Sequence, residues 1–281
     1  MAIDLHTHSN ESDGSDTSRE LVQKAARKGL SAVALTDHDT LSGIEAATEE
    51  ASIQGIELIP GTELSVTWAK GGMHIVVLWL SPSEGPLQNK LAFLQDARAN
   101  RNARIVDRLQ ELEYDITLEE IAAEAGAGVI GRPHFAAVLV QKGYVPNPQA
   151  AFDELLAKGQ KAYLSRDLLE PVEAIELARA SGAVPIIAHP HTLGLDTSTE
   201  FADTFSMLAD AGLVGMEAYY PEYDHERQGE LVNLARSFGL VPSGGSDYHG
   251  TYKEHLDLGT GTGDLLVPDE VLAELRPYAE T

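Results

Sequence analysis

Histidines and carboxylates recur along the chain in short clusters that could bind metal ions. His6 and His8 are two residues apart, so on an extended strand both side chains point to the same side, as chelation of one ion by two imidazoles requires. A single His-x-His pair can also be explained by surface or hydrogen-bonded histidines. Further clusters follow, however: Thr36-Asp37-His38-Asp39, Gly61-Thr62-Glu63, His74, Ala188-His189-Pro190-His191 and Gly245-Ser246-Asp247-Tyr248-His249.

Most of these clusters come directly after a short apolar run that is typical of a β-strand. Such runs alternate with helical patterns, which indicates βα units with parallel strands. The predicted strands are Ala2–Leu5, Ala32–Leu35, Glu57–Ile59, Ile75–Leu80, Val184–Ala188, Met216–Tyr219 and Leu240–Pro242. The predicted helices between them are Ser18–Lys28, Leu41–Ser52, Pro171–Ser181, Glu200–Ala211 and Asp224–Phe238. Barrel enzymes gather catalytic residues at the carboxyl ends of their strands, so histidines at five such positions predict a metal cluster.

One stretch interrupts the alternation, because from about Gln88 to Lys158 only helical periodicity is found. We expect helices over Gln88–Glu113, Leu118–Glu124, Pro133–Lys142 and Gln149–Ala157. The prediction is therefore a first barrel part over residues 1–87, an all-helical insertion over 88–167 and a second barrel part over 168–281. Arg98, Arg101 and Arg104 are interpreted as a solvated helix face balanced by nearby acids, in preference to an RNA-binding stripe.

The composition limits the possible functions. The chain has 281 residues with 43% hydrophobic and 23% charged side chains, which is the balance of a globular protein. Its net charge of −24 argues against broad coating of nucleic acid, although one local groove could still be basic. It has no cysteine, so any metal must be held by histidines and carboxylates. Without a basic N-terminal segment or a long apolar run, a cytoplasmic protein with no membrane partner is expected.

The motifs together resemble those of the polymerase and histidinol phosphatase (PHP) family. They are Asp-x-His-x-His, Thr-Asp-His-Asp, Gly-x-Glu, a lone His, Arg-Pro-His, His-Pro-His and Gly-Ser-Asp-x-His, in this order from Asp4 to His249. The chain is most similar to the branch that contains nucleoside 3',5'-bisphosphate phosphatases and 5'-to-3' exoribonucleases acting on short RNA. The resemblance implies an α/β fold, a distorted seven-stranded (βα)7 TIM-like barrel with a helical insertion, and two to three divalent ions, Mn, Zn or Fe.

The resemblance also implies which residues hold the ions. The first ion would be bound by His6, His8, Glu63 and Asp247, the second by Glu63, His74 and His134, and the third by Asp13, His38 and His249. Some relatives have a histidine in place of Asp13, which could alternatively be a turn residue of its loop. Asp4 and Asp37 either orient imidazoles or make ordinary strand-end hydrogen bonds.

Two arginines are predicted to bind substrate against the acidic background. Arg132 stands at a predicted helix start, and Arg166 lies where the insertion returns to the barrel. Either could instead pair with one of the many acids. His189 is expected to contact substrate or to protonate the leaving alkoxide, and with Asp247 it is a predicted catalytic residue, whereas His191 is interpreted as a loop residue.

The expected activity is that of a phosphoric monoester hydrolase. We expect removal of the 3'-phosphate from a small nucleotide, a nucleoside 3',5'-bisphosphate, by a metal-bridging hydroxide that attacks in line. The first alternative is a 5'-to-3' exoribonuclease on short RNA. An amidohydrolase would commonly use a modified lysine as the bridge, where this chain offers Glu63, and an interaction module would not need so many donors at one mouth. The oligomeric state is not predicted.

Overall fold

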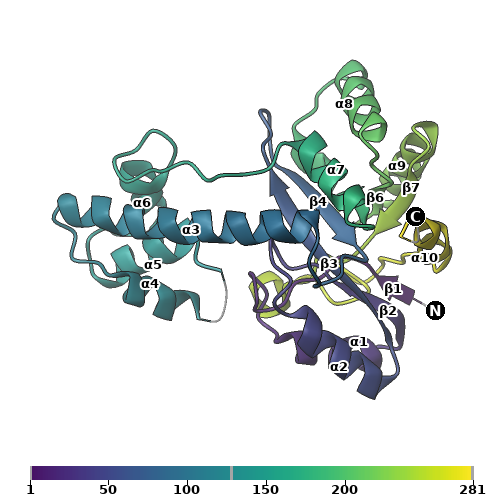
Figure 1. Cartoon of the computed structure of the whole chain (residues 1–281), viewed down its shortest axis with the longest axis horizontal. Helices are drawn as coiled ribbons and strands as arrows, with labels where there is room; N and C mark the ends of the chain where they lie inside the picture. Colours follow the sequence, from purple (N-terminus) through teal and green to yellow (C-terminus); the bar gives the residue numbers. More distant parts are fainter. Residues whose placement is uncertain (1, 127–128, 280–281) are drawn as a thin grey trace. The chain divides into compact units, whose positions relative to one another are not determined.

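The structure is a computed structural model that describes residues 2–126 and 129–279. The chain forms two compact units, one made of Met1–Leu91 with Leu168–Thr281 and the other of Ala92–Asp167 (Figure 1). The sequence placed a helical insertion at residues 88–167, between two parts of a barrel. No helix within the described ranges has the length and apolar character needed to cross a membrane.

The first unit is built on one mixed sheet whose strands lie side by side in chain order. The strands are β1 (Ala2–Asp4), β2 (Leu30–Leu35), β3 (Glu57–Val66), β4 (Met73–Leu78), β5 (Val184–Ile187), β6 (Gly215–Tyr219) and β7 (Val241–Gly244). The parallel pairings are β1 with β2, β2 with β3, β5 with β6 and β6 with β7, whereas β4 is antiparallel to both of its neighbours.

The prediction that all strands are parallel is therefore wrong for β4. Residues 67–72 alone connect β3 to β4. A parallel pair needs a crossover of about a dozen residues or more, so this short connection permits only a hairpin. The hairpin also makes β3 longer than predicted, because its second half, Gly61–Val66, pairs with β4.

The sheet curls into a distorted TIM-like barrel. Its first and last strands come together just beyond their carboxyl ends, where the N–H of Leu5 donates to the Gly244 carbonyl (3.3 Å) and the N–H of Asp247 to the His6 carbonyl (2.9 Å). One hydrophobic core combines side chains from all seven strands with the C-terminal segment Leu265–Leu275, including Val267 and Val271. This core holds the strand ends in fixed relative positions.

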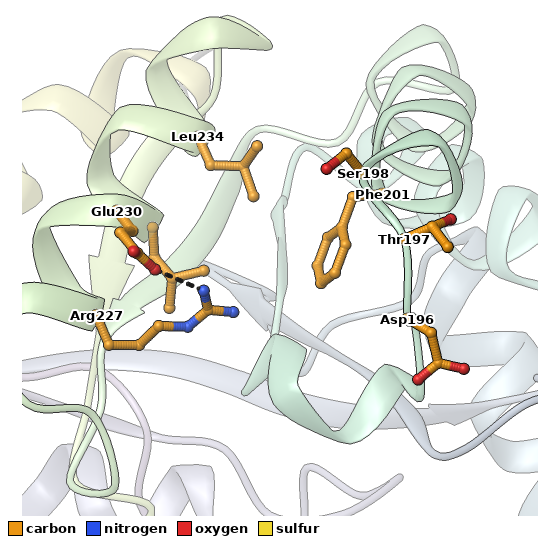
Figure 2. Close-up of a pocket in the computed structure, with 8 residues that line it drawn as sticks. Asp196, Thr197, Ser198, Phe201, Arg227, Glu230 and Leu234 are labelled. Carbon is orange, nitrogen blue, oxygen red and sulfur yellow. Dashed lines mark hydrogen bonds and ion pairs between the residues drawn. The ribbon is translucent and has the colours of Figure 1, made fainter.

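Helices cover the outside of the barrel. They are α1 (Ser18–Arg27), α2 (Ile44–Gln54), α7 (Pro171–Ala180), α8 (Ser198–Asp210), α9 (His225–Ser237) and the short α10 (Glu270–Leu275) (Figure 1). Thr17 caps α1 through a capping box with Glu20, which fixes where the helix begins. Figure 2 shows a pocket that is lined by Phe201 of α8 and by Leu234 and the ion-paired Arg227 and Glu230 of α9.

The described residues of the second unit form helices joined by turns and loops, without a strand. It contains most of α3 (Pro86–Glu111), followed by α4 (Leu118–Ala125), α5 (Arg132–Gln141) and α6 (Pro148–Ala151). A π-helical turn, Phe152–Leu156, continues α6 where a single α-helix was expected. The unit has its own core, in which Ile105 and Leu109 of α3 pack with Phe135 and Leu139 of α5 and with Leu155.

Candidate metal centre

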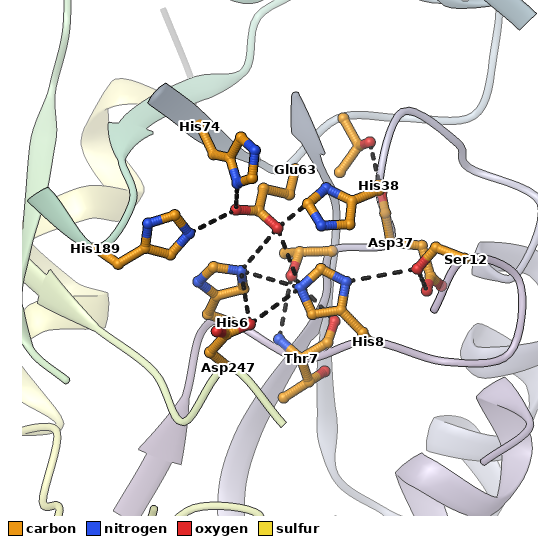
Figure 3. Close-up of polar contacts among 12 residues, drawn as sticks. His6, Thr7, His8, Ser12, Asp37, His38, Glu63, His74, His189 and Asp247 are labelled. Atoms are coloured by element: carbon orange, nitrogen blue, oxygen red, sulfur yellow. Dashed lines mark hydrogen bonds and ion pairs between the residues drawn. The ribbon is translucent and has the colours of Figure 1, made fainter. Parts of the chain in front are cut away.

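The predicted ligands of the barrel meet at one rim of the sheet (Figure 3). His6 follows β1, His38 follows β2, and Asp247 follows β7, each just past the end of its strand. Glu63 lies within β3, and His74 is near the beginning of β4, opposite Ser65 in the register. Because β4 runs in the opposite direction, its amino end lies at the same rim as the carboxyl end of β3. The antiparallel strand thus brings His74 to the centre.

Four donor atoms form the first subsite. The Nε2 atoms of His6 and His8 are 3.1 Å apart, and each is 3.2 Å from Oε2 of Glu63. The same two nitrogens lie 3.7 and 3.4 Å from Oδ1 of Asp247. A tetrahedral ion with ligand bonds of about 2.0–2.1 Å has donors about 3.4 Å apart. The spacing of these atoms therefore fits a single ion of zinc-like size.

The second subsite forms around the other oxygen of Glu63. Oε1 is 2.9 Å from Nδ1 of His74 and 3.0 Å from Nε2 of His189. Because the carboxylate presents Oε2 to the first subsite and Oε1 to this one, Glu63 has the geometry of a bridging ligand. His189, expected to be a substrate contact or proton donor, is the third member of this subsite in the structure.

A third group surrounds Asp13. Its Oδ1 is 3.3 Å from Nε2 of His249 and 3.5 Å from Nδ1 of His8, and its Oδ2 is 3.7 Å from Nε2 of His38. The side chain of Asp13 is 53% exposed, whereas that of His8 is fully buried. The structure thus brings together the three residues that were predicted to share an ion, at the solvent side of the centre.

The hydrogen bonding of the centre is what a metal site requires. Nδ1 of His38 and Nδ1 of His74 are buried and have no hydrogen-bond partner among the described residues, although each is close to a Glu63 oxygen. A buried polar atom without a partner is costly. A divalent ion that takes imidazole and carboxylate ligands, such as zinc, manganese or iron, would satisfy Nδ1 of His74 in the second subsite.

The pKa values of three donors show that the imidazoles and carboxylates of the centre stabilise each other's charged forms. Burial lowers the pKa of His6, but the carboxylates of Glu217 and Glu63 outweigh it, so that this pKa is raised well above its ordinary value. The pKa of His8 is raised to about 10, because hydrogen bonds to Asp247 and Glu63 outweigh its burial. The pKa of Glu63 is lowered in spite of burial by the surrounding imidazoles. Without an ion, the charged forms of His6 and His8 are therefore favoured.

Among the described residues, Asp4 and Asp37 make strand-end and loop hydrogen bonds and no direct hydrogen bond to an imidazole; Asp37 reaches the ring of His8 only through the hydroxyl of Ser12. Asp4 accepts hydrogen bonds from the backbone N–H and the hydroxyl of Ser246 (2.9 and 2.6 Å) and from the N–H of Gly259 (2.8 Å). Asp37 accepts from the backbone N–H and hydroxyl of Ser9. Both carboxylates hold the loops that carry ligands, because they satisfy backbone groups that the strand ends leave unpaired.

Three residues near the centre were not identified from the sequence. Oδ2 of Asp247 accepts hydrogen bonds from the hydroxyl of Tyr220 (2.8 Å) and from Nζ of Lys253 (2.6 Å), which leaves Oδ1 for the first subsite. Glu217, 2% exposed on β6, lies against His6. A carboxylate inside an otherwise apolar strand was a signal in the sequence, whereas the other two residues had none.

Both ring nitrogens of His191 have polar partners, although the residue lies in the connection after β5. Its Nδ1 is 2.8 Å from the hydroxyl of Tyr223, and its Nε2 is 3.3 Å from a carboxylate oxygen of Glu222. The ring also packs at 6.0 Å from that of His189. His191 is thus oriented by its neighbours, and among the described residues it meets the metal donors only through the ring of His189.

The remaining predicted site residues lie in the helical unit. On α5, Nδ1 of His134 accepts the N–H of Gly131, and Arg132 donates to the Leu156 carbonyl at 3.2 Å and lies over the Tyr163 ring. The interpretation of the α3 arginines as a solvated face is wrong for Arg101, which is only 9% exposed.

Burial and the charges of three neighbouring arginines, Arg132, Arg166 and Arg98, lower the pKa of Arg101. These four guanidinium groups therefore form an arginine cluster within the helical unit.

A barrel with a rim of imidazoles and carboxylates defines the class as metal-dependent hydrolases, and comparisons with known proteins give the family. The chain matches the PHP domain over residues 4–169. A 5'-3' exoribonuclease of Haemophilus influenzae is 34% identical over 88% of this chain and 89% of that protein. A phosphoribosyl 1,2-cyclic phosphate 1,2-diphosphodiesterase of Eggerthella lenta is 32% identical (90% and 95% covered). A 3',5'-nucleoside bisphosphate phosphatase of Chromobacterium violaceum is 30% identical (92% and 90% covered).

A solved structure agrees with these relatives. The structure of a protein described as a metal-dependent phosphoesterase, from Bifidobacterium adolescentis, is 30% identical with a TM-score of 0.78, covering 98% of this chain and 96% of that one. The chain belongs to the PHP family. It is a metal-dependent phosphoesterase, and thus a hydrolase of phosphoester bonds.

Proposed function

We propose that this phosphoesterase removes the 3'-phosphate from nucleoside 3',5'-bisphosphates by hydrolysis of the monoester. The relative from Chromobacterium violaceum that carries this name supports the proposal, as does the acidic net charge of −24, which disfavours long nucleic acids. The observation that carries the substrate class is the arginine cluster. A chain with 44 acidic and 20 basic residues nevertheless gathers four guanidinium groups in one unit.

The cluster is suited to a phosphate because two of its members make no ion pair with a carboxylate in the part of the chain that the structure describes. Among the described residues, Arg101 donates to the Leu164 carbonyl and to the amide of Asn102, and Arg132 donates to the Leu156 carbonyl. Guanidinium groups that are held by neutral acceptors keep their charge available for an anion. We propose that Arg132 binds the phosphate that is not hydrolysed, and that Arg166 adds positive charge there as a member of the same cluster.

The ligand sets follow from the distances within the barrel. His6, His8, Glu63 and Asp247 would hold the first ion, Glu63, His74 and His189 the second, and Asp13, His38 and His249 the third. His134 remains a prediction for the second ion. Oε1 of Glu63 already has two imidazole nitrogens within 3.0 Å, so His189 is our preferred ligand there.

The chain's own groups prepare the centre for phosphoryl transfer. Divalent ions bound by these donors would lower the pKa of a water molecule and neutralise charge on the phosphoryl oxygens. Tyr220 and Lys253 fix one oxygen of Asp247 and so leave the other for the centre. Asp13 is the most exposed of these donors, so solvent reaches the centre at its side chain.

A comparison of two substrates tests the proposal. With manganese and zinc supplied separately, kcat/KM is measured for phosphate release from adenosine 3',5'-bisphosphate and for mononucleotide release from a ten-nucleotide RNA. We expect phosphate release to dominate. Dominant mononucleotide release would favour the second candidate, a 5'-to-3' exoribonuclease, which the name of the Haemophilus influenzae relative supports.

A further inference from the structure

Glu217 is a buried carboxylate that lies behind the metal centre. It stands in the middle of β6 between Met216 and Ala218, two fully buried apolar residues, and it is itself only 2% exposed. An ionised carboxylate in such surroundings is stable only when both of its oxygens are hydrogen-bonded. The groups that donate hydrogen bonds to its two oxygens therefore indicate the role of Glu217.

One oxygen of Glu217 determines the protonation of His6. Oε1 lies 2.8 Å from Nδ1 of His6, and a carboxylate can only accept there, so Nδ1 carries a proton. In a neutral imidazole the other nitrogen then has a free lone pair. That nitrogen, Nε2, is the atom that lies 3.1 Å from Nε2 of His8 and 3.2 Å from Oε2 of Glu63 in the first subsite. Glu217 thus selects the tautomer of His6 that can bind an ion.

The other oxygen holds the backbone of His189. Oε2 accepts the N–H of His189 at 2.6 Å. His189 has φ 25° and ψ 67°, in the left-handed region that residues other than glycine rarely adopt. A hydrogen bond to a charged acceptor stabilises this unusual conformation. In it, Nε2 of His189 reaches within 3.0 Å of Oε1 of Glu63, in the second subsite.

We propose that Glu217 is a positioning residue that couples the two subsites, because one carboxylate orients the His6 ligand of the first and the His189 ligand of the second. The inference rests on the proposed ligand sets, and Glu217 itself binds no ion. A carboxylate that only tied β5 to β6 would affect folding and leave the affinity for metal unchanged. Metal affinity is therefore the measurement that separates the two roles.

The substitution Glu217→Gln tests the coupling with little change in shape. An amide has one acceptor and one NH2 group, so it cannot accept from both partners. If the NH2 group faces His6, the imidazole must move its proton to Nε2 and can no longer bind there. If it faces His189, two donors oppose each other and the strained backbone loses its support. Either arrangement damages one subsite.

We expect Glu217→Gln to bind at least one ion roughly 10- to 100-fold more weakly, as loss of a carboxylate behind a histidine ligand commonly does. Zinc affinity is measured by chelator competition, and the visible absorption of the cobalt-substituted protein reports the ligand geometry. Circular dichroism of the metal-free variant checks folding. Glu50→Gln is the matched control, because Glu50 is also buried, at 6% exposure, but lies on α2 against Gln23 and Gln54.

Zinc affinities within twofold of wild type together with an unchanged cobalt spectrum would overturn the inference. A second measurement needs no variant: nitrogen-15 NMR of the zinc-loaded wild-type protein should show His6 protonated at Nδ1 and zinc-bound at Nε2. The reverse tautomer would also overturn it. Wild-type protein that binds less than one equivalent of metal would refute the proposed centre as well, so the two failures are distinguishable.

Discussion

Glu63 offers the most direct test of the centre, through the substitution Glu63→Gln. Its two carboxylate oxygens lie within 3.2 Å of nitrogens from five imidazoles, in every case on residues proposed to bind an ion. The amide keeps the shape of the side chain and removes its charge. The substitution therefore affects both of the subsites that Glu63 is proposed to bridge.

The size of the effect follows from the charges. With an ion bound, the first subsite contains two neutral imidazoles and the carboxylates of Glu63 and Asp247. The two negative charges balance one divalent ion, and the substitution Glu63→Gln would remove one of them. Removing one partner of a buried charge pair costs about 3–5 kcal/mol. At about 1.4 kcal/mol for each factor of ten, metal affinity should fall by roughly 100- to 5,000-fold. Because chemistry needs the ions, kcat should fall by a similar factor at limiting metal.

The assay combines metal content by elemental analysis, zinc affinity by chelator competition and phosphate release from a nucleoside bisphosphate. Glu57→Gln is the control, since Glu57 lies on the same strand but is exposed and pairs with Arg276. It should bind metal and turn over as wild type does. A Glu63→Gln protein that retains two equivalents of metal and activity within tenfold of wild type would refute the bridging role.

Three further predictions concern other parts of the site. Tyr220→Phe removes a hydrogen bond from Asp247, so zinc affinity should fall about tenfold in chelator competition, and an unchanged affinity would contradict this role. Since the pKa of His8 is raised from 6.5 to about 10 in the metal-free protein, its stabilising interaction is complete below pH 6.5 and is lost as the pH rises toward 10.

Because the stabilising interaction of His8 is lost at high pH, urea unfolding of chelator-treated protein should show a lower midpoint at pH 9.5 than at pH 6.5. Equal midpoints at the two pH values would contradict this role of His8. Arg132→Met should raise KM for a nucleoside bisphosphate by roughly 10- to 150-fold, the worth of a charged hydrogen bond, with little effect on a simple phenyl phosphate. Arg227→Met, which changes an exposed arginine of α9, is its control and should leave both KM values unchanged.

Prediction from the sequence succeeded where a local rule was enough. The strand-end rule identified His6, His38 and Asp247, because a polar residue directly after a buried strand must lie at the rim of a sheet. The structure brings these residues together with Glu63 and His74 in the barrel unit. The family resemblance agrees with the matches to the PHP domain and to its phosphoesterases.

Prediction from the sequence did not reach positions that depend on a partner distant in the sequence. The strand-end rule predicted His189 at the rim, but its place beside Glu63, 126 residues away in the sequence, depends on the hydrogen bond that its backbone N–H donates to Glu217. Tyr220 and Lys253 had no pattern to reveal them, because each is placed by a carboxylate on a different element. Arg101 appeared to be solvated since its helical spacing cannot show what packs over it.

The sequence by itself therefore determined the kind of chemistry: imidazoles and carboxylates, with no cysteine, at the ends of alternating strands can hold only a nitrogen- and oxygen-ligated metal centre. Only the tertiary structure decided which donors share an ion. The short connection after β3 reverses β4 and so brings His74 to the rim, and Glu217 fixes the tautomer of His6. Distances between donors on different strands depend on how the sheet closes, and no local pattern in the sequence encodes that closure.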